Sequence, residues 1–271
     1  MTEGECARRC EADVPPGVAE PGIDVWLAFY DDIAEDALAE MLPVLNADER
    51  RQQVRFLLED DRKRYLVTRG MARTVLSEYV DVLPKNWRFL KDGFGRPRIA
   101  ELHGIGACGL SFNISHTRGL IAMAVTARRA VGVDVEHLAV RQVSMGVANG
   151  NFAPEEIADL ARIPPDQQQD RFFEYWTFKE SYAKARGLGM SIPLDKFGFQ
   201  LAGGGSVRLV ADPVLDHDVD RWRFWQYRPT RDHLLALCAD VGNERIPRVI
   251  IRRWIPAGAH AVLDLELLKA S

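Results

Sequence analysis

The sequence predicts an α+β fold built as two similar halves. Each half contains one long stretch of helical periodicity, Asp60–Tyr79 in the first and Asp166–Arg186 in the second. Short apolar runs of strand length follow each of these stretches. The chain has 271 residues, enough for one large domain or two of ordinary size. We therefore expect a disordered tail over 1–21, an N-terminal α+β half over 22–127 and a C-terminal α+β half over 128–271.

The elements of the first half follow from apolar runs and from turn residues. A helical stretch rich in arginine opens at Asp48, and the long helix that begins at Asp60 must end before Pro84. Glycines and a proline make the run Lys91–Arg98 a turn. The expected strands of this half are Val25–Tyr30, Ser111–Ser115 and Leu120–Val125.

The second half opens with a strand, because the valines of Val131–Glu136 alternate with other residues at period two. Pro154 suits a helix start, since two glutamates follow it where the helix dipole favours negative charge. The long helix follows Pro164-Pro165, and Gly187 can cap its end. The remaining expected strands are Phe197–Leu201, Val207–Val210, Trp222–Tyr227, Leu234–Cys238 and Val249–Trp254.

The composition limits the class of protein. A hydrophobic content of 47% with 27% charged residues is typical of a globular protein with a full core. The net charge of −4 argues against general nucleic-acid binding. The four cysteines have neither the spacing of a zinc site nor a disulfide framework. The sequence shows no signal peptide and no apolar stretch long enough to span a membrane, so we expect a cytoplasmic protein.

Two carboxylates lie on one face of the strand Val131–Glu136. Asp134 and Glu136 are two residues apart, so their side chains point the same way and the valines point the other way. Neighbouring like charges raise each other's pKa unless a cation lies between them. Oxygen ligands of this kind suit Mg²⁺. The alternative is a solvated acidic face of an ordinary strand.

The long helix of the second half carries charge on its apolar side. Intervals of three and four residues put four side chains on one stripe of this helix: Phe173, Trp176, Glu180 and Lys184. A surface helix normally keeps its ion pairs on the face opposite the aromatic residues. The simpler alternative is a Glu–Lys pair that supports the helix by roughly 0.2–0.5 kcal/mol.

The segment Phe112–Thr117 ends a strand with small polar groups and a histidine, a combination that can hold a phosphate. Ser115 and His116 are adjacent and point to opposite faces of a strand, which excludes a serine-hydrolase pair. The alternative for His116 is a satisfied core histidine. Arginines also concentrate in the first half, and most of them suit a solvated helix face.

Taken together, the order and spacing of these segments resemble the Sfp-type 4'-phosphopantetheinyl transferases. The resemblance covers most of residues 48–200, and the combination of motifs is far more specific than any one of them. Glu49 and Gln52 depart from the family pattern, in which some relatives carry lysines. The matching segments are Arg55–Arg64, Gly95–Pro97, Phe112–His116, Val131–Glu136 and Trp176–Lys184.

The resemblance implies a pseudo-twofold monomer of two α+β halves, with coenzyme A bound in the cleft between them. It implies that Asp134, Glu136 and Glu180 bind Mg²⁺. It further implies that Glu180 removes the proton of a carrier-protein serine, that Lys184 stabilises phosphate charge, and that His116 belongs to the same catalytic group. The partners it implies are coenzyme A and acyl or peptidyl carrier proteins, with no nucleic acid and no membrane.

The resemblance also implies a set of coenzyme A contacts. Ser115, His116 and Lys184 would surround the phosphates. Which of Arg50, Arg51 and Arg55 meets the 3'-phosphate stays open. The remaining contacts it implies are Arg64 at a phosphate and Arg96 with Pro97 at the adenosine.

Two other functions remain open on the sequence: a non-catalytic module that binds coenzyme A or a carrier protein, and a metal-dependent coenzyme A hydrolase. The carrier-docking surface is also an open question. The segment His137–Phe152 is apolar with few charges and follows the strand of Asp134 and Glu136. It is either a docking surface, in which Val143 and Met145 take part, or a loop over the core.

Overall fold

The structure is a computed structural model, and it describes residues 22–91, 93, 95, 97–100, 109–140, 142–143 and 145–271. The tail expected over 1–21 lies outside the described residues. The chain folds into two compact units of mixed α and β structure, which confirms the predicted fold class. One unit holds residues up to Phe112, Gly119–Arg128 and Pro247–Leu263; the other holds Asn113–Arg118, Arg129–Ile246 and Asp264–Ser271.

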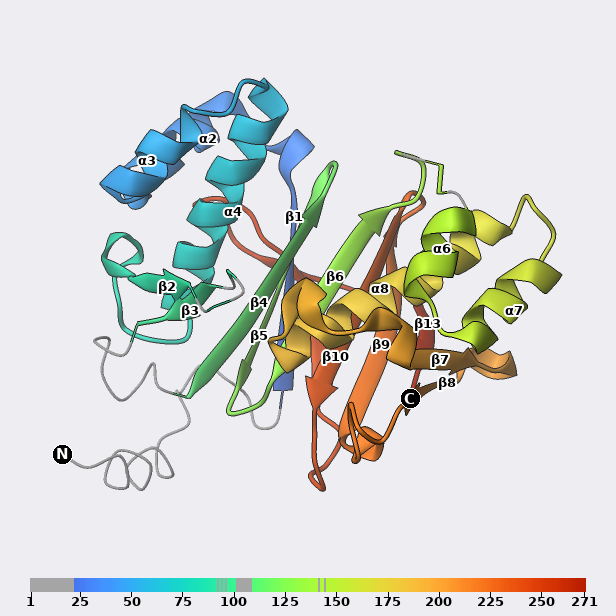
Figure 1. The fold of residues 1–271 in the computed structure, drawn as a ribbon. Helices are drawn as coiled ribbons and strands as arrows, with labels where there is room; N and C mark the ends of the chain where they lie inside the picture. Colours follow the sequence, from blue (N-terminus) through green and yellow to red (C-terminus); the bar gives the residue numbers. More distant parts are fainter. Residues whose placement is uncertain are drawn as a thin grey trace. The chain divides into compact units, whose positions relative to one another are not determined.

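A mixed five-stranded sheet is the frame of the first unit (Figure 1), although residues Asn113–Thr117 of its edge strand β4 belong to the second unit. Its strand order is β12-β11-β1-β5-β4, with β1 parallel to β11 and antiparallel to β5. The strand expected at Val249–Trp254 is β11, so a segment from beyond residue 128 lies in the same sheet as β1. The strands are β1 (Gly22–Phe29), β4 (Leu110–Thr117), β5 (Leu120–Ala127), β11 (Arg248–Arg253) and β12 (Ala261–Leu263).

Helices α2 and α4 of the first unit pack closely together at a glycine. Gly70 of α4 lies against Met41 of α2, where a Cβ would come within 2.8 Å of the Met41 sulfur. Asn46 caps α3 by accepting from the Glu49 amide at 2.9 Å, and Glu49 returns the bond to the Asn46 amide at 3.0 Å. The elements are α2 (Glu35–Met41), α3 (Ala47–Gln53), α4 (Glu59–Ser77) and the hairpin of β2 (Phe89–Lys91) with β3 (Pro97–Ile99).

The second unit is a four-stranded antiparallel sheet of order β13-β9-β10-β6, with α8 packed against β6 and β10 (Figure 1). Gly187 ends α8 in the left-handed region at φ 68°, as its place in the sequence predicts. The strands are β6 (Val131–His137), β7 (Phe197–Leu201), β8 (Val207–Ala211), β9 (Trp222–Thr230), β10 (His233–Asp240) and β13 (Leu267–Ala270). The helices are α6 (Met145–Asn151), α7 (Pro154–Arg162) and α8 (Gln168–Arg186).

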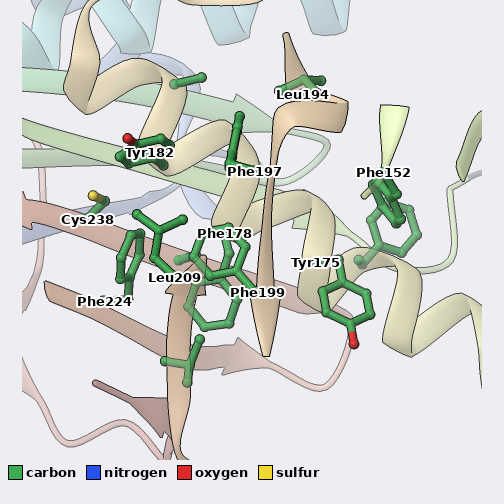
Figure 2. Close-up of a cluster of buried hydrophobic side chains, with 14 of the residues drawn as sticks. Phe152, Tyr175, Phe178, Tyr182, Leu194, Phe197, Phe199, Leu209, Phe224 and Cys238 are labelled. Atoms are coloured by element: carbon green, nitrogen blue, oxygen red, sulfur yellow. The ribbon is translucent and has the colours of Figure 1, made fainter. Parts of the chain in front are cut away.

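The core of the second unit is aromatic and lies around α8 (Figure 2). Phe178 of α8 stacks on Phe199 of β7 with ring centroids 5.1 Å apart. Phe224 of β9 meets Phe199 edge-on at 4.9 Å. Aromatic pairs in these geometries add about 0.5–1.5 kcal/mol each beyond their area burial. This cluster holds α8 in one orientation and so determines which way its polar side chains point.

One buried ion pair also fixes α8. Lys179 is fully buried and donates to Glu156 of α7 at 2.8 Å. Its ammonium donates to the carbonyls of Leu194 and Phe197 as well, at 2.8 and 2.5 Å. Glu156 in turn accepts from the Phe199 amide at 2.9 Å. The pair is stable in this position because nearly every donor and acceptor is satisfied.

Candidate active site

A glycine brings α8 close to β6. A Cβ at Gly132 would overlap the backbone oxygen of Ser181 and would come within 2.5 Å of the Ala185 nitrogen. Any larger residue would push the helix away from the strand. Gly132 lies within the strand motif Val131–Glu136, but the motif's alternation alone does not indicate this close approach. This close approach carries Glu180 and Lys184 of the helix to the carboxylates of the strand.

Lys184, Ser115 and Asp134 form one hydrogen-bonded group. The Lys184 Nζ donates to Asp134 Oδ1 at 2.6 Å and to Ser115 Oγ at 2.9 Å. The Ser115 hydroxyl donates to the same Asp134 oxygen at 2.9 Å. Asp134 and Ser115 are buried, while the Lys184 side chain keeps 24% of its surface exposed. A charge-assisted contact of this length is short and strong.

Glu180 and Asp134 each leave one oxygen unsatisfied. Among the residues that the structure describes, the buried atoms Asp134 Oδ2 and Glu180 Oε1 have no hydrogen-bond donor. Burial raises the pKa of the Glu180 carboxyl, the Asp134 charge raises it further, and Lys184 lowers it. Buried acceptors without partners are costly, and a divalent cation would satisfy both oxygens. These two residues therefore fit a hard metal ion.

Glu136 faces a tryptophan. Its Oε1 accepts from the indole Nε1 of Trp176 at 3.1 Å. No three His, Cys, Asp or Glu side chains within the described part of the chain converge closely enough to form a preformed metal cage. The structure thus brings Asp134 and Glu180 together and holds Glu136 through Trp176. The sequence put Trp176 on the same stripe as Glu180 but did not predict its bond to Glu136.

His116 lies on the other side of β4 from Ser115. It is exposed, whereas Ser115 is buried, as alternation along a strand requires. The hydrogen bonds that join Lys184, Ser115 and Asp134 are made by these three side chains, and His116 points to the opposite face of the strand. Pro97 begins β3 in the first unit. Arg96 lies outside the described residues.

The arginines that we expected at the coenzyme A phosphates lie in the first unit. Arg51 is exposed and pairs with Asp48 on the same helix. Arg64 pairs with Asp61, and its guanidinium lies 3.5 Å from Asp60. Arg55 is exposed just beyond the end of α3. Surface pairs of this kind contribute about 0–1 kcal/mol, so the carboxylates hold Arg51 and Arg64 only weakly.

The departure from the family pattern at Glu49 has a structural reason. Glu49 accepts from the Nε of Arg73 at 3.0 Å and forms the capping box of α3. Arg73 is fully buried, and it also donates to the carbonyls of Pro84 and Trp87 at 3.1 and 2.9 Å. A carboxylate at position 49 is thus the counter-ion of a buried cation, and a lysine there would leave that cation without one.

The segment that we considered for carrier docking contains both exposed and partly buried residues. Val143 and Met145 pack partly against the hydrophobic cluster of the second unit. Val140 and Val147 are exposed, with 50% and 39% of their surfaces accessible. The core alternative therefore holds in part for Val143 and Met145, while Val140 and Val147 are available at the surface.

Comparison with known sequences defines the class of protein. A sequence model of the 4'-phosphopantetheinyl transferase superfamily matches residues 130–238, and a model described as "4'-phosphopantetheinyl transferase, N-terminal" matches residues 33–128. The first match contains Asp134, Glu136, Glu180 and Lys184.

Individual relatives agree with the two models. A 4'-phosphopantetheinyl transferase of Bacillus subtilis is 32% identical over 199 residues, which cover 73% of this chain and 84% of the relative. The 4'-phosphopantetheinyl transferase HetI of Nostoc sp. is 34% identical over 160 residues, covering 59% of this chain and 67% of HetI. The 4'-phosphopantetheinyl transferase Sfp of Bacillus subtilis is 28% identical over 65% of this chain and 75% of its own length.

The chain therefore belongs to the 4'-phosphopantetheinyl transferase superfamily, as the motifs predict, and it is an enzyme of this type. Of the helices in the described part of the chain, none has both the length and the apolar character that a membrane span needs.

Proposed function

We propose that this enzyme transfers the 4'-phosphopantetheine arm of coenzyme A to a serine of an acyl or peptidyl carrier protein and releases 3',5'-ADP. The observation that carries the proposal is the cluster of Lys184, Asp134 and Glu180, with its two buried and unsatisfied carboxylate oxygens. The match to the superfamily supports the same reaction. We further propose that the enzyme acts as a cytoplasmic monomer.

In this reaction the serine oxygen forms a bond to the β-phosphorus of the coenzyme A diphosphate, and the bond from that phosphorus to the bridging oxygen breaks. Glu180 accepts the serine proton, and its raised pKa brings the carboxyl closer to the range of an effective base. Lys184 donates to the phosphate oxygens on which charge develops. The residues thus act by placement and electrostatics, as phosphoryl transfer requires.

We propose that Asp134, Glu136 and Glu180 hold Mg²⁺. The unsatisfied oxygens of Asp134 and Glu180 support this assignment, and the hydrogen bond from Trp176 would orient Glu136. When bound, the ion would supply positive charge to the diphosphate and to the leaving ADP. Lys184 lies 2.6 Å from Asp134 and balances part of its negative charge.

The remaining proposed contacts with coenzyme A are side chains with donors suited to phosphate. Arg64 and one of Arg50, Arg51 and Arg55 would meet phosphates through guanidinium groups. His116 is exposed and can donate from its ring. Ser115 would act through Lys184, to which it is hydrogen-bonded. The proposed contacts on the adenosine side remain Arg96 and Pro97.

One assay separates this proposal from its two rivals. The protein is mixed with coenzyme A, Mg²⁺ and an apo-carrier protein, and the products are weighed by mass spectrometry. Transfer gives a heavier carrier and 3',5'-ADP. Hydrolysis of coenzyme A gives free phosphopantetheine and an unchanged carrier, and a binding module gives neither product. A carrier whose acceptor serine is replaced by alanine is the matched control, and it must stay unmodified.

A further inference from the structure

On the edge of β6 that faces away from β10, backbone amides donate hydrogen bonds to side-chain oxygens of β4. β6 is the last strand of its sheet and pairs on one side with β10. The amides of a strand alternate between its two sides, so every second N–H of β6 faces away from β10. Val133 and Val135 are buried, so their amides need acceptors from elsewhere in the protein.

Three residues of β4 supply acceptors for these two amides and for the amide of His137. The Val133 amide donates to Asn113 Oδ1 at 2.9 Å, and the His137 amide donates to Thr117 Oγ1 at 3.2 Å. Between them the Val135 amide donates to Ser115 Oγ at 3.4 Å. The partners are 20 residues apart in every case, so the two strands run in the same direction in constant register. All these residues belong to the second unit.

The three acceptors are not equivalent. Ser115 gives the longest of the three bonds because its hydroxyl also donates to Asp134 and accepts from Lys184. The bonds that the two outer acceptors, Asn113 and Thr117, form with β6 are shorter. Asn113 holds β6 one residue before Asp134, and Thr117 holds it one residue after Glu136. The two carboxylates therefore lie between two fixed points of the backbone.

We propose that Asn113 and Thr117 are positioning residues that hold the β6 backbone so that Asp134 and Glu136 present their carboxylates to the metal. The proposal rests on the metal role given to these carboxylates above. Asn, Ser and Thr share little except an oxygen acceptor, which is the feature that the amides of β6 require.

Thr117 offers the cleanest test. Thr117→Val keeps the shape of the side chain and removes the acceptor, whereas Thr117→Ser keeps the acceptor. The matched control is Thr126→Val in the first unit, where the lost hydroxyl donates to the Gly22 carbonyl at 2.9 Å. Three quantities are measured for each protein: amide hydrogen exchange over 131–138 without metal, Mn²⁺ affinity by electron paramagnetic resonance, and the Mg²⁺ concentration for half-maximal transfer.

We expect Thr117→Val to exchange faster over 131–138 and to bind Mn²⁺ roughly 10–100-fold more weakly, with the same shift in half-maximal Mg²⁺ and an unchanged KM for coenzyme A. Thr117→Ser and Thr126→Val should keep the metal affinity of the parent. If Thr117→Val fails to fold, Asn113→Leu removes the acceptor at the other end and should give the same pattern.

Faster exchange with unchanged Mn²⁺ affinity would overturn the proposal, because the bonds would then serve the fold alone. Unchanged exchange in Thr117→Val would overturn it as well. If the parent shows no transfer, the proposed reaction is wrong, and the Mn²⁺ affinities still decide whether Thr117 positions the carboxylates.

Discussion

Lys184 and Asp134 form a contact of 2.6 Å between the ammonium of a helix and the carboxylate of a strand. The contact exists because Gly132 lets α8 approach β6 closely. It satisfies one oxygen of Asp134 and leaves the other, Oδ2, without a donor among the described residues. A buried carboxylate with one unsatisfied oxygen costs stability, and a cation at the proposed metal site would offset that cost.

Replacing Glu180 by Gln should separate activity from stability. Loss of a general base typically lowers the rate by about 10²–10⁴. The pKa of Glu180 is raised, so its contribution to stability is present at low pH and is lost as the pH rises through the folded-state value. At pH 7 the neutral amide removes that penalty. We therefore expect the metal-free variant to have a higher Tm than the parent at pH 7, and a smaller advantage at pH 4, in thermal unfolding with chelator present.

Two results would contradict this role of Glu180. One is turnover by Glu180→Gln within a few-fold of the parent at saturating Mg²⁺. The other is a lower Tm than the parent at pH 7.

Replacing Trp176 by Phe should weaken the metal site without removing a ligand. The variant loses the bond from Nε1 to Glu136 but keeps an aromatic ring stacked near Phe172, whose centroid lies 5.8 Å away. Removing a hydrogen-bond donor to a metal ligand typically costs about 10–100-fold in metal affinity or activity. We expect the Mg²⁺ concentration for half-maximal transfer to rise by a factor in this range.

The control for Trp176→Phe is Tyr175→Phe on the same helix, which loses a 2.7 Å bond to Asp159. It should cost about 1 kcal/mol of stability and leave the Mg²⁺ dependence unchanged. Equal shifts in half-maximal Mg²⁺ for both variants would mean that Trp176 acts only by packing.

Lys179→Met should destabilise the second unit, because Glu156 then becomes a buried charge without its cation. Breaking one side of a buried pair costs about 3–5 kcal/mol. Burial already raises the pKa of Glu156, and loss of Lys179 raises it further. The deficit should therefore be smaller at pH 5 than at pH 8, as measured by urea unfolding. The double variant Lys179→Met with Glu156→Gln should recover part of the loss. A deficit that is the same at both pH values, with no recovery, would show that the charge is not the cause.

Val147→Asp should raise the KM for the carrier protein and leave coenzyme A binding unchanged. Val147 is exposed on α6, and a carboxylate there would remove an apolar contact from the docking surface considered above. The control is Val214→Asp, at a position that is 96% exposed elsewhere in the same unit. Steady-state kinetics with one carrier protein measure both variants. If they change the KM equally, docking takes place on another surface.

Periodicity predicted most of the secondary structure, including α8 and β6, because both patterns are local. It did not predict α6, since Met145–Asn151 contains two glycines and two asparagines, which are poor helix formers. The parallel pairing of β1 with β11 joins opposite ends of the chain and leaves no trace in local sequence. Helix α2 was also missed, because its seven residues are too few for a clear period.

The sequence predicted those features of the candidate site that depend only on the spacing of residues along one helix or strand. The stripe of α8 predicted that Glu180 and Lys184 point the same way. The sequence could not show that Gly132 is the contact point, or that Trp176 bonds to Glu136, because both depend on how α8 crosses β6. Asn113 and Thr117 lie in the segment Phe112–Thr117, which the sequence predicts to be a strand with a polar end. Their bonds to β6 could not be predicted, because they depend on how the two strands lie in the tertiary structure.

The most direct test of the carboxylate site is Asp134→Ala, with coenzyme A binding measured by calorimetry and transfer measured by carrier mass. We expect transfer to be abolished while coenzyme A still binds, more weakly than to the parent, because the basic contacts survive. Excess chelator should have the same effect on the parent enzyme. Full activity of the parent in chelator, or normal transfer by Asp134→Ala, would contradict a metal-dependent site at these residues.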